Sequence, residues 1–118
     1  MIPAAILLFA AAGRPTDYFS DHVAPILQQH CLKCHNHELD DGNISFEDRE
    51  TLLRNRKNGG PAIVPGAPEE SALVRAIRYK GDIRMPPGKR LTRGEIRTLI
   101  QWVRLGAPWA RFESAPKQ

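Results

Sequence analysis

Both cysteines of the chain and three of its four histidines lie within ten residues, in the stretch QQHCLKCHNH at 28–37. Cys31, Cys34 and His35 form the pattern Cys-x-x-Cys-His. Two cysteines three apart on a helical turn face the same way, so their sulfurs can attach to one edge of a single group. A chain of 118 residues buries a modest core, and small folds often depend on a metal, a disulfide or a cofactor. This stretch therefore constrains the fold more than any other.

Cys-x-x-Cys-His is the attachment pattern of c-type haem. The two sulfurs add to the vinyl groups on one haem edge, and the next residue, His35, becomes the proximal iron ligand. A zinc site is the main alternative, since Cys31, Cys34 and His35 or His37 could supply three or four ligands. Closed zinc sites usually draw on two separated pairs, and the sequence has no second pair. A thioredoxin-like dithiol expects a βαβ context, which is not seen. The pattern favours one covalently bound haem c with its iron.

The second axial ligand of the iron is predicted to be Met85, the only methionine besides the initiator. Met85 lies in the loop RMPPG, where Pro86 and Pro87 restrict the backbone and disfavour a helix. A stiff loop suits a weak thioether ligand, and His/Met ligation raises the reduction potential. The remaining histidines are alternative sixth ligands, but we interpret all three as surface residues: His22, His30 and His37.

The N-terminus begins MIPAAILLFAAAGRP, with an uncharged apolar run from Ile2 to Ala12. The run is too short to span a bilayer and matches the apolar core and Ala-x-Ala element of a secretory signal, although no Lys or Arg precedes it. Either the true start lies upstream or the run is not a signal. We favour export, because Gly13-Arg14-Pro15 breaks the pattern where a mature chain would begin. We expect a signal peptide over 1–13, truncated if the true start lies upstream, one domain over 14–112, a tail over 113–118, and a periplasmic or otherwise extracytoplasmic location.

The rest of the chain alternates helical patterns with loops rich in Pro and Gly, which predicts an all-α fold. We expect helices over 17–30, kinked at Pro25, over 47–57, over 69–79, and from Thr92 to a stop at Gly106. Thr92 and Glu95 form a capping box. The apolar residues at helical spacing are Phe19, Val23, Ile26, Leu27, Leu52, Leu53, Leu73, Val74, Ile77, Ile96, Leu99, Ile100 and Val103.

Four stretches in this order resemble a class I cytochrome c, and most closely the planctomycete-type cytochrome c domain: VAPILQQHCLKCH, AIVPGAPEESALV, RMPPGKRLTRGEI and LIQWVRLGAPW, within 18–109. The resemblance implies a small fold with crossed N- and C-terminal helices around one covalently bound haem. It assigns Cys31 and Cys34 to the thioethers, His35 to the proximal ligand and Met85 to the distal ligand. Family members often have Gly after the haem histidine, where this chain has Asn36.

The resemblance also predicts the contacts inside the fold. Phe19 and Val23 should meet Leu99, Trp102 and Val103 where the terminal helices cross. The residues expected to line the haem are Ile26, Leu27, Ile44, Leu53, Ile63, Val64, Leu73 and Ile77. Each of them is equally consistent with ordinary packing in the core. The loop residues Pro65 and Pro86 complete the predicted cofactor contacts.

We therefore predict a monohaem electron carrier and not an enzyme, because no residue pair indicates acid–base or nucleophilic catalysis. The alternatives are a haem-containing docking or sensor module, or a small peroxidase, acting with a larger enzyme. The net charge is +4, and twelve of the 17 basic residues are Arg. Basic residues near the ligand loops could neutralise the haem propionates and steer an acidic redox partner: Lys33, Arg54, Arg56, Lys57, Arg84, Lys89 and Arg90. We expect no nucleic-acid partner, no membrane span in the mature chain, and a monomer.

Overall fold

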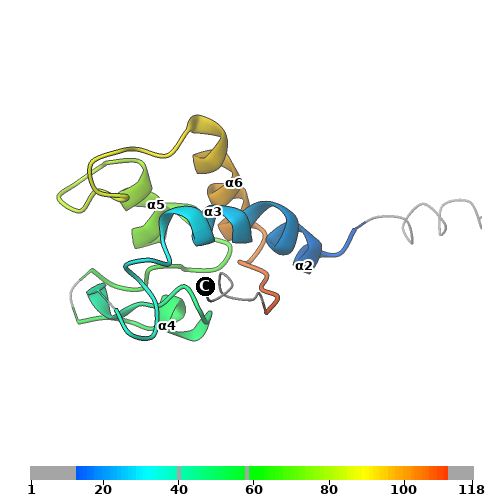
Figure 1. The fold of residues 1–118 in the computed structure, drawn as a ribbon, viewed down its shortest axis with the longest axis horizontal. Coiled ribbons are helices and arrows are strands. Elements are labelled where there is room, and N and C mark those ends of the chain that lie inside the picture. The colour runs from blue at the N-terminus through cyan, green and yellow to red at the C-terminus, as the bar shows by residue number, and fades with distance from the viewer. Residues whose placement is uncertain (1–12, 40, 58, 112–118) are drawn as a thin grey trace, which may run out of the picture.

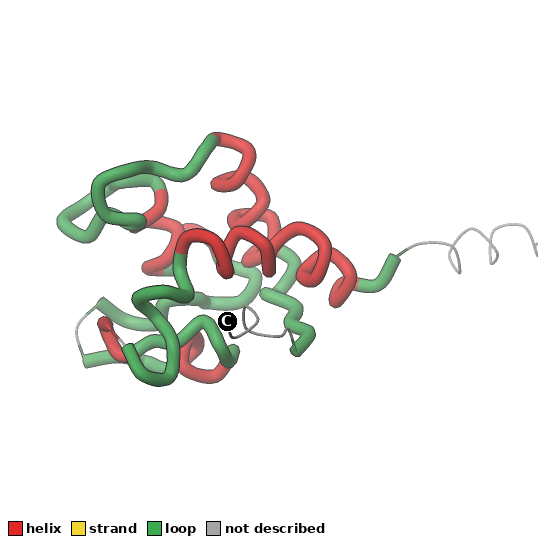
Figure 2. The backbone as a smooth tube through the Cα atoms, in the orientation of Figure 1, coloured by secondary structure: helices red, strands yellow, loops and turns green. Residues whose placement is uncertain are grey.

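The computed structural model describes residues 13–39, 41–57 and 59–111, and these contain helices and loops but no strand (Figure 2). Most of the predicted signal peptide and the whole predicted tail fall outside these ranges. The elements in order are α2 (Pro15–Tyr18), η1 (Phe19–Val23), α3 (Ala24–His30), η2 (Asp41–Asn43), α4 (Glu50–Leu53), η3 (Pro68–Glu70), α5 (Ala72–Ile77) and α6 (Arg93–Arg104) (Figure 1). The prediction of a small, mostly helical domain is confirmed. No helix among the described residues is long and apolar enough to cross a bilayer.

The first helical segment is continuous from α2 through η1 to α3, close to the predicted 17–30. Its irregularity is a π-helical turn, η1, in which the Ala24 N–H bonds to the Phe19 carbonyl. Pro25 follows directly and has no N–H to give to the carbonyl four residues earlier. The predicted kink therefore takes the form of a widened turn just before the proline.

Two helices are shorter than the apolar spacing predicted. α4 covers Glu50–Leu53 instead of 47–57, because the Asp48 carboxylate accepts the Thr51 N–H at 3.1 Å and Arg54 turns to an extended conformation. α5 begins at Ala72 instead of 69, because Ser71 is extended and its hydroxyl bonds to the preceding loop. Local side-chain hydrogen bonds thus set where α4 and α5 begin.

α6 agrees with its prediction at both ends. The Thr92 hydroxyl accepts the Glu95 N–H at 3.1 Å, and the Glu95 carboxylate accepts the Thr92 N–H at 2.9 Å, which completes the capping box. At the C-terminal end, the Gly106 N–H bonds to the Val103 carbonyl and the Ala107 N–H to the Trp102 carbonyl. This pattern is a Schellman motif, with Gly106 in the left-handed conformation at φ 97°.

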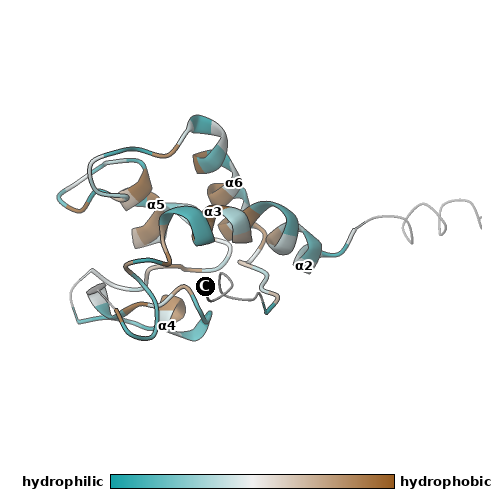
Figure 3. Cartoon of the chain, in the orientation of Figure 1, coloured by the Kyte–Doolittle hydropathy of each residue, from teal (hydrophilic) through white to brown (hydrophobic). Residues whose placement is uncertain are grey.

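The core forms where the first helical segment packs against α6. Phe19 contacts Trp102 with ring centroids 5.9 Å apart, and Trp109 covers Phe19 at 4.4 Å. Phe19 and Trp102 are fully buried, and so are Val23, Leu99 and Val103, as predicted. Figure 3 shows the hydrophobic stretches of α5 and α6 lying beside α3. The two terminal helices thus build one wall of the domain.

Arg49 fastens the loop before α4 to the end of α6. Its guanidinium donates to the carbonyls of Gly106 and Ala107, at 2.9 and 2.8 Å. Carbonyls at a helix C-terminus lack helical partners and favour a cation. We expect Arg49→Ala to lower the free energy of unfolding by about 2 kcal/mol, measured by denaturant unfolding. Arg104→Ala is the matched control, because Arg104 is exposed and, among the described residues, its guanidinium bonds only to Gln101 of the same helix. Equal losses in the two variants would contradict this role.

Candidate functional site

The Cys-x-x-Cys-His stretch forms a single turn that continues from the end of α3. The Cys31 N–H bonds to the Leu27 carbonyl at 3.0 Å, and the His35 N–H bonds to the Cys31 carbonyl at 3.1 Å. The Cys34 N–H also points to the Cys31 carbonyl, at 3.3 Å. These hydrogen bonds place Cys31, Cys34 and His35 on a single turn.

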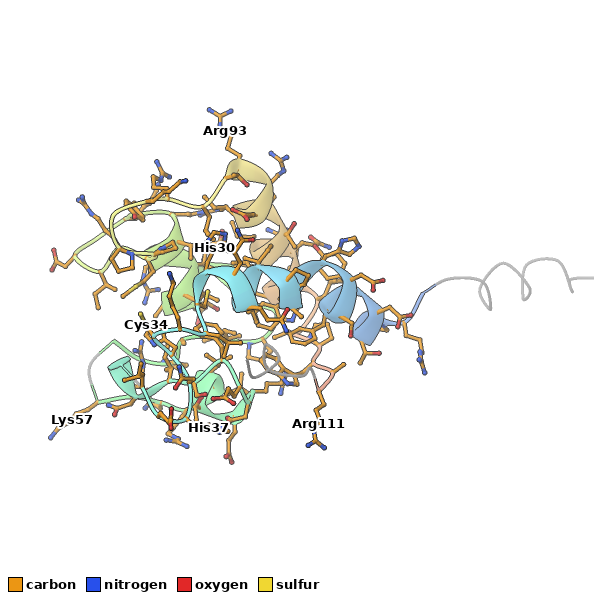
Figure 4. All side chains as sticks on the ribbon, viewed as in Figure 1. His30, Cys34, His37, Lys57, Arg93 and Arg111 are labelled. Carbon is orange, nitrogen blue, oxygen red and sulfur yellow. The ribbon has the colours of Figure 1, made fainter. Side chains whose placement is uncertain are left out.

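The two cysteines have different surroundings, and neither is in a disulfide. Cys31 is buried at the edge of the hydrophobic core. Cys34, labelled in Figure 4, is exposed. Burial and the negative charge of Glu95 raise the pKa of Cys31 to about 12. A dithiol that exchanges disulfides needs a lowered thiol pKa, because the thiolate is the nucleophile. The surroundings of Cys31 therefore oppose the redox-dithiol interpretation.

The imidazole of His35 is buried, and one of its ring nitrogens makes no hydrogen bond among the described residues. The exposed fraction of His35 is 8 %, and its Nδ1 atom is the buried nitrogen with no hydrogen-bond partner among the residues that the structure describes. Phe46 stands edge-on to the ring at 5.8 Å, and the Phe46 N–H bonds to the His35 carbonyl at 2.7 Å. A buried unpaired polar atom is costly. The site therefore suits an imidazole that gains a further partner when a ligand group is bound.

Two of the other three histidines, His30 and His37, pair with carboxylates. His37 is exposed and its Nε2 lies 3.0 Å from Asp48, and His22 is exposed beside the Tyr18 ring. His30 is not the surface residue we predicted: it is half-buried, with Nε2 at 3.1 Å from the Glu95 carboxylate of α6. Within the described ranges, no three side chains of His, Cys, Asp or Glu are grouped to hold a metal ion. The zinc alternative thus has no support from these residues.

Met85, the predicted distal ligand, lies in the loop between α5 and α6. The side chain is half-buried, and the Met85 N–H bonds to the Ala76 carbonyl near the end of α5 at 3.0 Å. The contacts that the structure gives for Met85 join it to α5 and not to His35. Pro86 is likewise half-buried.

Most of the predicted lining residues share one hydrophobic cluster with Cys31: Ile26, Leu27, Ile44, Ile63, Leu73 and Ile77. Leu53 packs on this cluster and is partly buried, as is Val64. Pro65 is exposed, so it lies outside the cluster. The cluster connects the Cys-x-x-Cys-His turn to the helix that holds the Met85 loop.

A cavity with several basic side chains lies next to the residues that follow His35. It has a volume of about 370 Å³ and is lined mostly by polar and basic side chains from three segments: Asn36, His37, Asn43, Ile44, Ser45, Thr51, Arg54, Asn55, Arg56 and Lys57. The Arg56 guanidinium is already bonded to the carbonyls of Gly60 and Gly42. Arg54 and Lys57 are exposed.

A sequence model of planctomycete cytochrome c matches residues 31–89, which is half of the chain. The match starts at Cys31 and includes the whole Cys-x-x-Cys-His turn and Met85. The chain belongs to the planctomycete cytochrome c family. No curated protein and no solved structure matches the chain. The resemblance predicted from four sequence stretches is thus confirmed.

The residues of this cytochrome c domain fit a covalently attached haem. Two free thiols stand on one turn with the spacing of the haem attachment motif. The imidazole of His35 follows them, and it is buried with one ring nitrogen unpaired among the described residues. An imidazole in such a place is suited to binding iron. The apolar cluster beside Cys31 supplies a surface that a large flat apolar group could share.

Sequence reasoning missed how Asn36 shapes the turn after His35. The Asn36 side-chain amide donates to the Leu32 carbonyl at 2.6 Å, and its oxygen accepts the N–H groups of Glu38 and Leu39. Asn is well suited to this role because its short amide bonds to nearby backbone. The departure from the Gly that is frequent in the family is therefore compensated locally.

Proposed function

We propose that this protein is a monohaem c-type cytochrome that carries single electrons between redox partners outside the cytoplasm. The proposal rests on one observation, the Cys-x-x-Cys-His turn at the end of α3 with its buried, unpaired His35, in a chain of the cytochrome c family. Cys31 and Cys34 would hold the haem through thioethers, and His35 and Met85 would bind its iron. When bound, the haem supplies a one-electron centre whose iron alternates between ferric and ferrous.

Residues around the Cys-x-x-Cys-His turn would orient the iron ligand His35 and hold the attachment site in place. The hydrogen bonds at the His35 N–H and carbonyl, together with the Phe46 ring, fix where the imidazole points. The buried Cys31 anchors one side of the attachment turn in the core, while Cys34 is open to solvent. Electrons would then pass at the side of Cys34, where a partner can approach. Cytochrome c domains generally work outside the cytoplasm, which agrees with the proposed location.

A sensor module or small peroxidase would need an open or easily vacated sixth position. The hydrogen bond between the Met85 N–H and the Ala76 carbonyl opposes this, since it fixes the backbone of the ligand loop. Electron transfer without catalysis is therefore the function that these contacts support best.

The partner is proposed to be acidic. Five exposed cations lie in or near the ligand loops in the sequence, and we propose that they act together as a basic rim: Lys33, Arg54, Lys57, Arg84 and Lys89. Arg56 bonds to two carbonyls and Arg90 lies over Tyr79, so both are occupied within the fold. Complementary charge mainly raises association rates.

This rim predicts a salt dependence that tests the proposed function. The second-order rate of electron transfer with a small acidic redox protein should fall on the order of tenfold from low salt to about 0.1 M, where charges act over only about 10 Å. Stopped-flow mixing measures the rate, and an uncharged reductant serves as the control. A rate that stays flat or rises with the acidic protein would reject the basic rim, and a protein that cannot be reduced and reoxidised would reject the electron carrier.

A further inference from the structure

α5 ends in the same backbone motif as α6, but with an unusual residue at its key position. The Tyr79 N–H bonds to the Ala76 carbonyl at 3.1 Å, and the Lys80 N–H bonds to the Arg75 carbonyl at 3.0 Å. These two bonds make a Schellman motif, whose left-handed residue is usually Gly. In α6 that residue is Gly106, whereas in α5 it is Tyr79, at φ 60°.

A residue with a Cβ atom is disfavoured in the left-handed region, and a bulky one more so. Such conformations persist where the surroundings fix them, and they are frequent at functional sites. The side chain of Tyr79 must therefore make contacts that offset the backbone cost. Gly would fit this position without them, as it does in α6.

Those contacts reach the loop that carries Met85. The Tyr79 hydroxyl donates to the Pro86 carbonyl. The Arg90 guanidinium lies over the Tyr79 ring, with its central carbon 5.3 Å from the ring centroid, and also donates to the Arg78 carbonyl at 3.4 Å. Both ends of the loop after Met85 are thus joined to the end of α5, which the loop passes on its way to α6 (Figure 1).

Met85 is consequently held from both sides. Its own N–H bonds to the Ala76 carbonyl, and the carbonyl of the next residue, Pro86, accepts the Tyr79 hydroxyl. We propose that Tyr79 is a positioning residue that holds the Met85 loop against α5 and so keeps the thioether sulfur at the haem iron. This inference rests on the proposed His35/Met85 ligation. A thioether is a weak ligand, so the freedom of its loop decides how easily another ligand displaces it.

The test is a titration of the ferric, haem-loaded full-length protein with imidazole, which competes with Met85 for the iron. Tyr79→Phe keeps the ring under Arg90 and removes only the hydroxyl. We expect imidazole to bind about fivefold more tightly to this variant, which corresponds to one net hydrogen bond. Tyr18→Phe is the matched control, because the Tyr18 hydroxyl also donates to a backbone carbonyl, that of Thr98, at 3.2 Å. The control should leave the affinity for imidazole unchanged.

Tyr79→Gly separates positioning from general stability. Gly relieves the left-handed backbone, so the variant should unfold at no lower denaturant concentration than Tyr79→Phe, yet bind imidazole at least as tightly as Tyr79→Phe does. A merely structural role for Tyr79 would instead make affinity and stability change together. Unchanged imidazole affinity in both variants would overturn the positioning role.

Met85→Ala distinguishes failure of this inference from failure of the proposed ligation. If Met85→Ala raises imidazole affinity and Tyr79→Phe does not, Met85 is the ligand and Tyr79 does not position it. If Met85→Ala changes neither the affinity nor the ferric spectrum, the ligation itself is wrong and the role of Tyr79 falls with it.

Discussion

Replacing Met85 with alanine should abolish the weak long-wavelength sulfur-to-iron band of the ferric protein. It should also lower the reduction potential, because the thioether favours ferrous iron. The vacated position should bind carbon monoxide in the ferrous state, which the unchanged protein should resist. Visible spectroscopy and a redox titration measure these effects.

Ile83→Ala is the control for this experiment. Ile83 lies two residues before Met85 in the same loop and is 62 % exposed, so its truncation should leave the band and the potential unaltered. If Met85→Ala has the spectrum of the unchanged protein, the sixth ligand is another residue, and His22 is the next to replace.

Replacing either Cys31 or Cys34 with serine should leave haem attached through one thioether bond or not at all. The two variants should also differ in their yield of folded haem protein. Cys31 is buried against the core, whereas Cys34 is exposed. A serine hydroxyl at position 31 would be buried without an evident partner, at a cost of about 1–3 kcal/mol. Cys31→Ser should therefore yield less folded haem protein than Cys34→Ser.

Haem staining of denaturing gels and mass spectrometry of the protein produced in a host that attaches haem measure this difference. Cys34→Ser isolates the loss of one thioether, because its side chain is already in solvent. Full covalent attachment in both variants would contradict the assignment of Cys31 and Cys34.

The parts of the fold that the sequence predicted well are those in which local signals agree with packing. The capping box of Thr92 and Glu95 and the Gly106 stop fixed both ends of α6. The Cys-x-x-Cys-His spacing placed the attachment turn correctly, because neighbouring positions in one turn are set by backbone geometry alone. Phe19 against Trp102 followed from the family resemblance, and the two rings do meet.

Other features depend on contacts between distant segments, which single-sequence patterns do not show. His30 seemed a surface residue, but Glu95 of α6 comes within 3.1 Å of it. The Thr92 N–H and His30 together hold the pKa of Glu95 below its ordinary value, so this carboxylate serves both a helix cap and a link between the two terminal helices. No local signal could have indicated that link.

Tyr79 is the clearest case of a residue whose role the sequence patterns did not indicate. α5 ends in a Schellman motif, and Tyr79 stands where such a motif usually has Gly. A side chain at a position that favours Gly indicates a specific contact, but its partner, Pro86, becomes visible only once the loop is folded back.

The most direct test of the central claim is acid–acetone extraction of the purified protein, followed by spectra of the oxidised and reduced polypeptide. All the colour should stay with the denatured chain, because thioethers at Cys31 and Cys34 survive unfolding. The chain should also show the reduced spectrum of a haem with two thioether bonds. Colour that passes entirely into the solvent would contradict covalent attachment, and with it the assignment of this protein as a c-type electron carrier.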